Sequence, residues 1–200
     1  MWQGSVVRHL KKCEDLNNLN ILCEKMRIIA KAKKDDYPEY AEMYMKLLPD
    51  DGLILNHLKD NFLMVKKLIY SLPEEKLFYR YEKGKWSIKE ILVHIIDDER
   101  IFAYRALRFA RNEKLNLIGF DQDSYAIYSE ADKRNLDTIF EEYEAVRNST
   151  IVLFNGLPEE SFDRMGHGTG TANDATVRAL AYHIAGHELH HINFIKEKYL

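Results

Sequence analysis

The 200-residue sequence has little of what marks a membrane, secreted or nucleic-acid-binding protein. It contains no apolar run close to the roughly 18 residues of a membrane span, and its start, MWQGSVVRHLKKCEDL, lacks the apolar core of a secretory signal. Its two cysteines, Cys13 and Cys23, make neither a disulfide framework nor a zinc site. Its net charge is −3 with acidic and basic residues interspersed, so nothing favours nucleic acid or an anionic membrane. We therefore expect a cytoplasmic protein with neutral or small-molecule partners.

What the sequence does contain is enough apolar residues, 46% of the chain, for the core of one domain. Four stretches repeat their apolar residues at helical spacing: 51–72, 87–111, 136–154 and 176–199. The second has the clearest start, because Ser87 and Glu90 have the spacing of a capping box and Trp86 and Ile91 that of a hydrophobic staple. These patterns predict an all-α protein, a four-helix bundle with one long crossover connection.

The chain also contains signs of an internal repeat. The tetrapeptide Leu-Pro-Glu-Glu follows both the first and the third helical stretch, at 72–75 and 157–160. Aligning the second stretch with the fourth, from Ser87 and Thr176, brings polar positions into register. The matched residues are His94 with His183, Asp98 with His187, and Glu99 with Glu188. Two helix pairs built on one plan again indicate a four-helix bundle.

Two regions lack a sustained helical pattern. Residues 1–36 are lysine-rich, and two alternatives stay open for them: an appended helix, or a chain whose natural start is Met26. Residues 112–134 are predicted to form the long crossover. Connections of this length in compact domains are usually functional or mobile, so one alternative is that the crossover lies over a pocket. The other is a plain link between non-adjacent helices of the bundle.

The last helical stretch is unusually rich in histidine. Four histidines lie within nine residues: His183, His187, His190 and His191. His187 and His191 differ by only about 40° around a helix axis, so they can chelate one ion from a single face. Leu180, Ile184 and Phe194 lie within about 60° of His187 on the same helical wheel, which points these histidines into the bundle. The spacing therefore predicts a buried metal site.

The other histidines have simpler explanations. Taken singly, His183 and His190 are better explained as core histidines with satisfied hydrogen bonds. Residues 187–191 spell H-E-x-x-H, the zinc-protease signature in which the glutamate activates water. That signature needs a third ligand downstream, and only nine residues with one acidic side chain, Glu197, follow it. We therefore expect the remaining ligand to come from upstream, and no protease.

The best upstream candidate is His94, the single histidine of the second helical stretch. His57, in the first stretch, is a weaker candidate because nothing else on its helix supports it. Three neutral imidazoles with an open fourth position make a typical catalytic metal site. Asp98, one turn beyond His94, has three roles open to it: a fourth ligand, an acceptor for an imidazole N–H, or a base.

Several of these motifs together resemble one known family. They are Gly84-Lys85-Trp86-Ser87 leading to His94, then Asp97-Asp98-Glu99-Arg100, Gly119-Phe120-Asp121-Gln122-Asp123, and Gly186-His187-Glu188 with His190-His191. Over residues 37–200 the chain resembles the DinB-like (YfiT-like) metalloproteins, with residues 1–36 largely outside the pattern. The resemblance implies a bundle of unusual helix order and frequent homodimers. It also implies one divalent ion, zinc or nickel with manganese or iron as alternatives, on His94, His187 and His191.

The family includes thiol-dependent transferases, but the resemblance does not fix the reaction. One hypothesis is an enzyme whose ion activates a low-molecular-weight thiol for attack on a small electrophile, with Asp98 helping to remove the proton. No cysteine lies near the site in the sequence, so such a thiol has to be a cosubstrate. The alternatives are a hydrolase that uses metal-activated water, a non-catalytic protein that binds metal or a small ligand, and a bundle with coincidental histidines.

Overall fold

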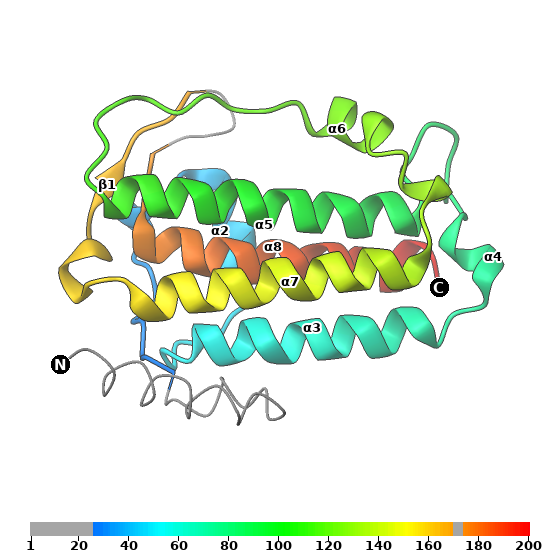
Figure 1. Cartoon of the computed structure of the whole chain (residues 1–200), viewed down its shortest axis with the longest axis horizontal. Coiled ribbons are helices and arrows are strands. Elements are labelled where there is room, and N and C mark those ends of the chain that lie inside the picture. Colours follow the sequence, from blue (N-terminus) through cyan, green and yellow to red (C-terminus); the bar gives the residue numbers. More distant parts are fainter. Residues whose placement is uncertain (1–25, 170–173) are drawn as a thin grey trace, which may run out of the picture.

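The fold is described by a computed structural model that covers residues 26–169 and 174–200. Its long helices are α3 (Ile54–Tyr70), α5 (Ile88–Ala110), α7 (Leu136–Gly156) and α8 (Val177–Lys198). They correspond to the four predicted stretches, so the four-helix bundle is confirmed (Figure 1). No helix in the described part of the chain is long and apolar enough to cross a membrane.

The starts of three long helices are fixed by side-chain caps. Ser87 caps α5: its hydroxyl oxygen accepts the Glu90 N–H at 3.1 Å, and the Glu90 carboxylate accepts the Ser87 N–H at 2.8 Å. The predicted capping box is therefore present. Asn135 caps α7, and the Thr176 hydroxyl accepts the Ala179 N–H at 3.1 Å to cap α8.

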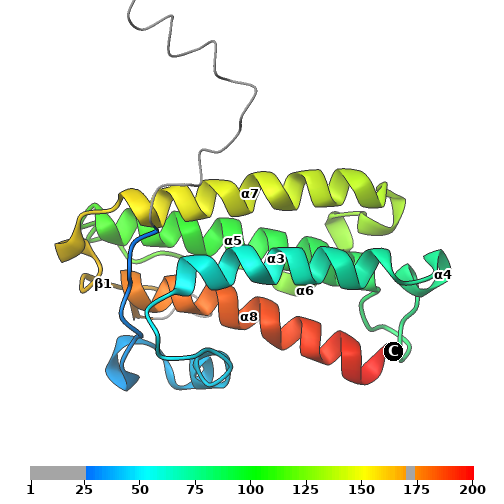
Figure 2. The same ribbon diagram turned by 90° about the horizontal axis from the view of Figure 1, so that it is seen from below.

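The helix order around the bundle differs from the order along the chain. α5 and α3 each contact both α7 and α8. Therefore α3 lies diagonally opposite α5, and α7 lies diagonally opposite α8 (Figure 2). α5 and α7 are neighbours and run in the same direction, which requires a connection along the whole length of the bundle (Figure 1). The crossover thus joins adjacent helices, and the alternative of a link between non-adjacent helices is wrong.

The connections contain short elements that periodicity did not predict. The crossover includes α6 (Gln122–Tyr128) and a 3-10 turn at Ala131–Lys133. Two-residue antiparallel strands, β1 (Met165–Gly166) and β2 (Ala175–Thr176), precede α8. After each Leu-Pro-Glu-Glu proline the chain makes one turn of helix, as α4 (Glu74–Leu77) and as the 3-10 turn Glu159–Ser161.

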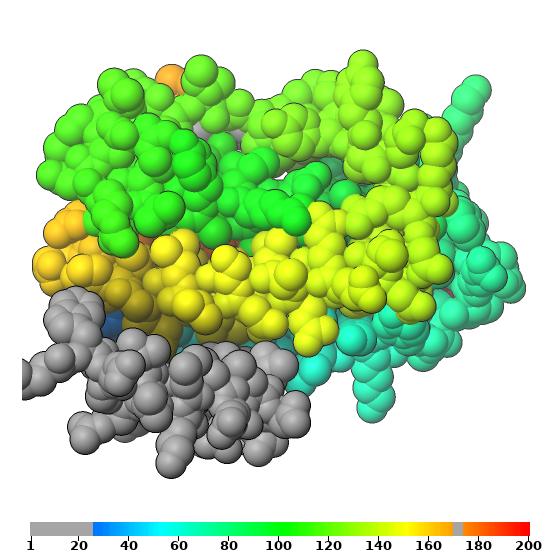
Figure 3. Space-filling model, in the orientation of Figure 1, coloured from blue at the N-terminus to red at the C-terminus, as the bar shows by residue number. Residues whose placement is uncertain are grey.

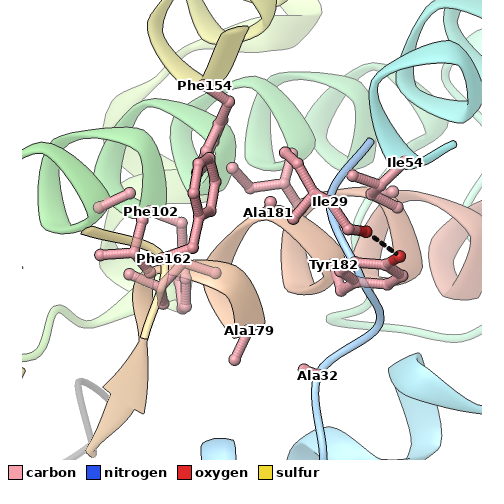
Figure 4. Close-up of a cluster of buried hydrophobic side chains, with 14 of the residues drawn as sticks. Ile29, Ala32, Ile54, Phe102, Phe154, Phe162, Ala179, Ala181 and Tyr182 are labelled. Atoms are coloured by element: carbon pink, nitrogen blue, oxygen red, sulfur yellow. Dashed lines mark hydrogen bonds between the residues drawn. The ribbon is translucent and has the colours of Figure 1, made fainter. Parts of the chain in front are cut away.

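Residues 26–50 wrap around the end of the bundle. The Ile29 N–H donates to the Gly52 carbonyl at 2.9 Å, and the Tyr182 hydroxyl of α8 donates to the Ile29 carbonyl at 2.7 Å (Figure 4). Ile29 and Ala32 are buried in the core among side chains of the long helices. Short 3-10 turns at Lys34–Asp36 and Glu39–Ala41 lead to α2 (Glu42–Met45), which packs on α8. The alternatives for the chain start fall mainly on residues 1–25, outside the described residues.

Candidate metal centre

Three histidines from two helices meet in the bundle core. His94 of α5 and His187 and His191 of α8 place one ring nitrogen each within 4.8 Å of the others. The Nε2 atom of His187 lies 3.1 Å from Nε2 of His94 and 3.0 Å from Nε2 of His191. The structure therefore brings together the three histidines that the sequence singled out, and it is the Nε2 atoms that converge.

This arrangement fits a divalent cation. Nitrogens bound tetrahedrally at about 2.05 Å from one ion lie about 3.3 Å apart, close to the spacing of these Nε2 atoms. Burial lowers the pKa of His94, and it holds the pKa values of His187 and His191 well below the ordinary value, with neighbouring histidines adding to the effect. All three rings are thus neutral near pH 7, which is the form of imidazole that ligates metals.

Asp98 lies behind the cluster. One of its carboxylate oxygens is 3.3 Å from Nδ1 of His187 and 3.5 Å from Nε2 of His183. It therefore faces the edge of the His187 ring opposite the nitrogen that points at His94 and His191. Among the three roles open from the sequence, this position suits an acceptor for the Nδ1–H of His187, which leaves the Nε2 lone pair available.

His57, His183 and His190 stand outside the group of three. His183 is buried, and its ring stacks on Phe102 with the centroids 3.7 Å apart. His190, directly before His191 in α8, is half-buried. His57 contacts Asp51 at 2.9 Å, at the start of α3, and does not join the cluster.

The glutamate of the H-E-x-x-H stretch points away from the histidines. Glu188 accepts hydrogen bonds from the Tyr143 hydroxyl and from the Arg147 guanidinium, the latter at 3.0 Å. Arg147 also binds Glu99 at 2.9 Å, so the two glutamates matched by the internal repeat hold the same arginine. Glu188 thus belongs to an ion cluster between α5, α7 and α8, and it is not placed to activate water as in a zinc protease.

A pocket of about 730 Å³ opens at His191, the one member of the three that lines it. Its lining includes Trp86, His190, His191 and Phe194, with Asp123 and Ile127 contributed by α6. The Trp86 ring lies 4.7 Å from the His94 ring and 6.5 Å from that of His191. The crossover alternative in which this segment lies over a pocket is therefore the one that the structure supports.

Tyr44 is a site residue that sequence reasoning missed. Its ring meets those of His183, His187 and His190 edge-on, at centroid distances of 5.1, 5.5 and 5.5 Å. The approach depends on Gly186, because a Cβ atom there would lie 2.6 Å from the Tyr44 carbonyl oxygen. Gly186, next to His187, indicated that another segment approaches the helix there. Nothing in the α2 sequence indicated that α2 is that segment.

Comparison with known proteins agrees with this architecture. The profile of the DinB superfamily matches residues 58–195. A protein of Oceanobacillus iheyensis, described as a candidate metal-dependent hydrolase, is 29% identical over 130 residues, which cover 64% of this chain and 73% of that protein. A Bacillus licheniformis protein with the same description is 26% identical over 135 residues, covering 66% and 76%.

A solved structure shows the same fold. YfiT from Bacillus subtilis, described as a candidate metal-dependent hydrolase with an unusual four-helix bundle topology, superposes with a TM-score of 0.67 at 15% identity. The match covers 84% of this chain and 90% of YfiT. Because the family profile spans more than half of the sequence and includes His94, His187 and His191, the chain belongs to the DinB superfamily.

Proposed function

We propose that this chain is a metal-dependent enzyme in which His94, His187 and His191 hold one divalent cation beside a pocket for a small-molecule substrate. The observation that carries the proposal is the convergence of three neutral imidazole nitrogens on one point next to that pocket. Imidazole ligands suit zinc and nickel, with manganese and iron as alternatives.

The chain's own residues prepare the site. The Asp98 carboxylate lies 3.3 Å from Nδ1 of His187 and favours the tautomer that carries its proton there and leaves the Nε2 lone pair free. Trp86 covers the His94 ring and keeps water from that side. A divalent ion with three protein ligands supplies an open position at which water or a thiol loses its proton more readily.

We propose hydrolysis of a small electrophilic substrate as the reaction. The described residues that line the pocket include no serine, threonine or cysteine, which favours a nucleophile from outside the chain. Water is the simplest such nucleophile, and the relatives from Oceanobacillus and Bacillus are described as candidate metal-dependent hydrolases.

Transfer of a low-molecular-weight thiol is the second candidate. The pocket volume of about 730 Å³ leaves room for a thiol cosubstrate together with the electrophile. In this case the same three histidines would hold the ion, which would make the proton of a thiol easier to remove.

Elemental analysis and cobalt substitution test both parts. We expect about one divalent ion per chain in the wild type and in His183→Ala, and almost none in His187→Ala or His191→Ala. Normal metal content in either of the last two variants would contradict the site.

The reaction is tested on the cobalt-substituted protein with a panel of ester, amide and epoxide substrates. A new sulfur-to-cobalt charge-transfer band on addition of physiological thiols, with thiol-dependent turnover, would identify the transferase. Turnover without thiol and an unchanged spectrum would identify the hydrolase. Absence of any turnover in a fully loaded protein would leave a metal-binding protein without catalysis.

A further inference from the structure

The crossover gives one helical face to the pocket. Ala126 and Ile127 of α6 come three and four residues after Asp123, so the three share one helix face, and all three line the pocket. Figure 3 shows the crossover and α6 along one edge of the bundle, above α5. The wall formed by α6 therefore carries one acidic group among apolar ones.

The start of α6 is held in a fixed conformation, which sets the direction of Asp123. The Asp121 carboxylate accepts the N–H groups of Asp123 and Ser124, at 3.1 and 3.3 Å, and the Ser124 hydroxyl at 2.7 Å. This is an N-cap, and it leaves the Asp123 side chain itself unused.

Most other charges around the pocket neutralise one another. Arg80 donates to Glu90, to Asp132 at 2.9 Å and to the Lys85 carbonyl at 2.6 Å. Glu90 additionally accepts the Ser87 N–H as part of the α5 cap. The guanidinium and both carboxylates are thus committed to the protein and offer little to a ligand.

Asp123 differs from these groups. Within residues 26–169 and 174–200 its carboxylate makes no ion pair or hydrogen bond, and only its backbone N–H is used. It lies near enough to His94 for its charge to act on that imidazole. Lys85 also lines the pocket and lacks an ion pair in the described chain; both side chains are exposed, but Lys85 lies on the loop before α5 and Asp123 on α6.

Aromatic rings form much of the remaining wall. Tyr81 lies 5.5 Å from Phe194 and 5.3 Å from Tyr199, centroid to centroid, and Trp86 stands next to them at the histidines. The faces of such rings attract cations as well as flat apolar groups. A pocket of aromatic rings with one uncommitted carboxylate is suited to an amine that has an apolar body.

We propose that Asp123 is the specificity-determining residue of this pocket and that it binds an ammonium group of the substrate while the aromatic rings hold its apolar part. This proposal rests on the proposed function, because it concerns the substrate of the same metal centre. The acidic group that faces the pocket is thus Asp123 of the crossover, whereas Asp98 lies on the other side of the His187 ring.

Fluorescence of Trp86 tests the proposal without any assay of turnover. The chain has two tryptophans, Trp2 and Trp86, so Trp2→Phe leaves Trp86 as the only reporter. Two matched probes, 2-phenylethylamine and 2-phenylethanol, are titrated into zinc-loaded and metal-free protein, so that coordination of the amine to zinc is recognised. We expect the amine to bind about fivefold more tightly than the alcohol, the upper range for an exposed ion pair.

Asp123→Asn should remove this preference and leave the affinity for the alcohol unchanged, whereas Asp123→Glu should keep it. Asp60→Asn, an exposed position of α3 outside the pocket, is the matched control and should behave as wild type. An unchanged preference in Asp123→Asn would overturn the proposal, as would tighter binding of 3-phenylpropionate than of the amine to metal-free protein. Metal content is measured in each variant. A wild type that binds no metal would refute the proposed function, whereas the preference for the amine can still be measured in metal-free protein.

Discussion

The bundle core contains two polar clusters that are adjacent on α8, at His187 and Glu188, and five residues apart on α5, at His94 and Glu99. The first is the group of His94, His187 and His191. The second, the Arg147 cluster, consists of Arg147, Glu99, Glu188 and Tyr143. Both use residues of α5 and α8, and the Arg147 cluster adds two from α7. In the Arg147 cluster donors and acceptors alternate, while in the histidine group three Nε2 atoms converge on one another.

Electrostatics separates the two clusters in the same way. Burial disfavours the charged form of Arg147, but Glu188 and Glu99 together keep its pKa well above the ordinary value. Burial also disfavours charged histidine, and His187 has no compensating effect, so its pKa falls well below the ordinary value. The Arg147 cluster pairs its guanidinium with two buried carboxylates, whereas the histidine group is neutral and directs lone pairs at a single point. This is the difference expected between an ion cluster that supports the fold and a group that binds a ligand.

The largest expected effect is on the Arg147 cluster. Arg147→Leu leaves Glu99 and Glu188 buried without their partner, so we expect a loss of about 3 to 5 kcal/mol in the free energy of unfolding, measured in urea. Adding Glu99→Gln and Glu188→Gln to the same variant should recover part of this loss. In contrast, metal-free His94→Ala should be destabilised less. Equal losses in Arg147→Leu and His94→Ala would remove the distinction between the two clusters.

Asp98 links the comparison to metal affinity. Asp98→Asn replaces the acceptor for the Nδ1–H of His187 by an amide, and we expect metal affinity, measured by competition with a chelator, to fall about 10- to 100-fold. Turnover at saturating metal should change less. Asp97→Asn is the matched control, because Asp97 is half-buried on the same helix and pairs with Arg100 at 3.7 Å. If turnover falls while metal affinity is retained, Asp98 acts as a base instead.

A pH titration separates the clusters without mutation. In the unfolded chain His187 and His191 take up protons near their ordinary pKa, about 6.5, while the folded protein resists protonation. The metal-free protein should therefore lose stability as the pH falls below about 6.5, by up to about 1.4 kcal/mol per pH unit for each histidine. Between about pH 7 and pH 9 these histidines should add no further slope. The same slope in a His187→Gln, His191→Gln double variant would place the protons elsewhere.

Local patterns made much of this architecture predictable. The capping box at Ser87 fixed the start of α5, and the spacing of His187 and His191 placed both on one helix face. His94 followed from the internal repeat, which also matched Glu99 with Glu188. The sequence did not reveal their shared partner, because Arg147 comes from another helix and its placement depends on packing of the whole bundle.

The parts that could not be predicted depend on contacts between distant segments. Tyr44 reaches the histidines only because α2 packs against Gly186, some 140 residues later in the chain. Asp123 lies in a crossover without periodicity, and its position depends on the cap at Asp121 and on the path of the chain along the bundle. The function of Asp98 also needed the structure, since a spacing of one turn from His94 fits a ligand, an acceptor or a base equally well.

The smallest expected effect tests whether the two clusters share the rigidity of α5. The Ser87 hydroxyl accepts the Glu90 N–H and donates to the Asp132 carboxylate at 2.6 Å, so it caps the helix and ties it to the crossover. Ser87→Ala should lower the free energy of unfolding by about 1 to 2 kcal/mol. Since α5 carries both His94 and Glu99, metal affinity should fall modestly together with the melting temperature, while Ser87→Thr should retain most of both. A lower melting temperature with unchanged metal affinity would mean that the histidine group is held by α8 and Tyr44 and not by the start of α5.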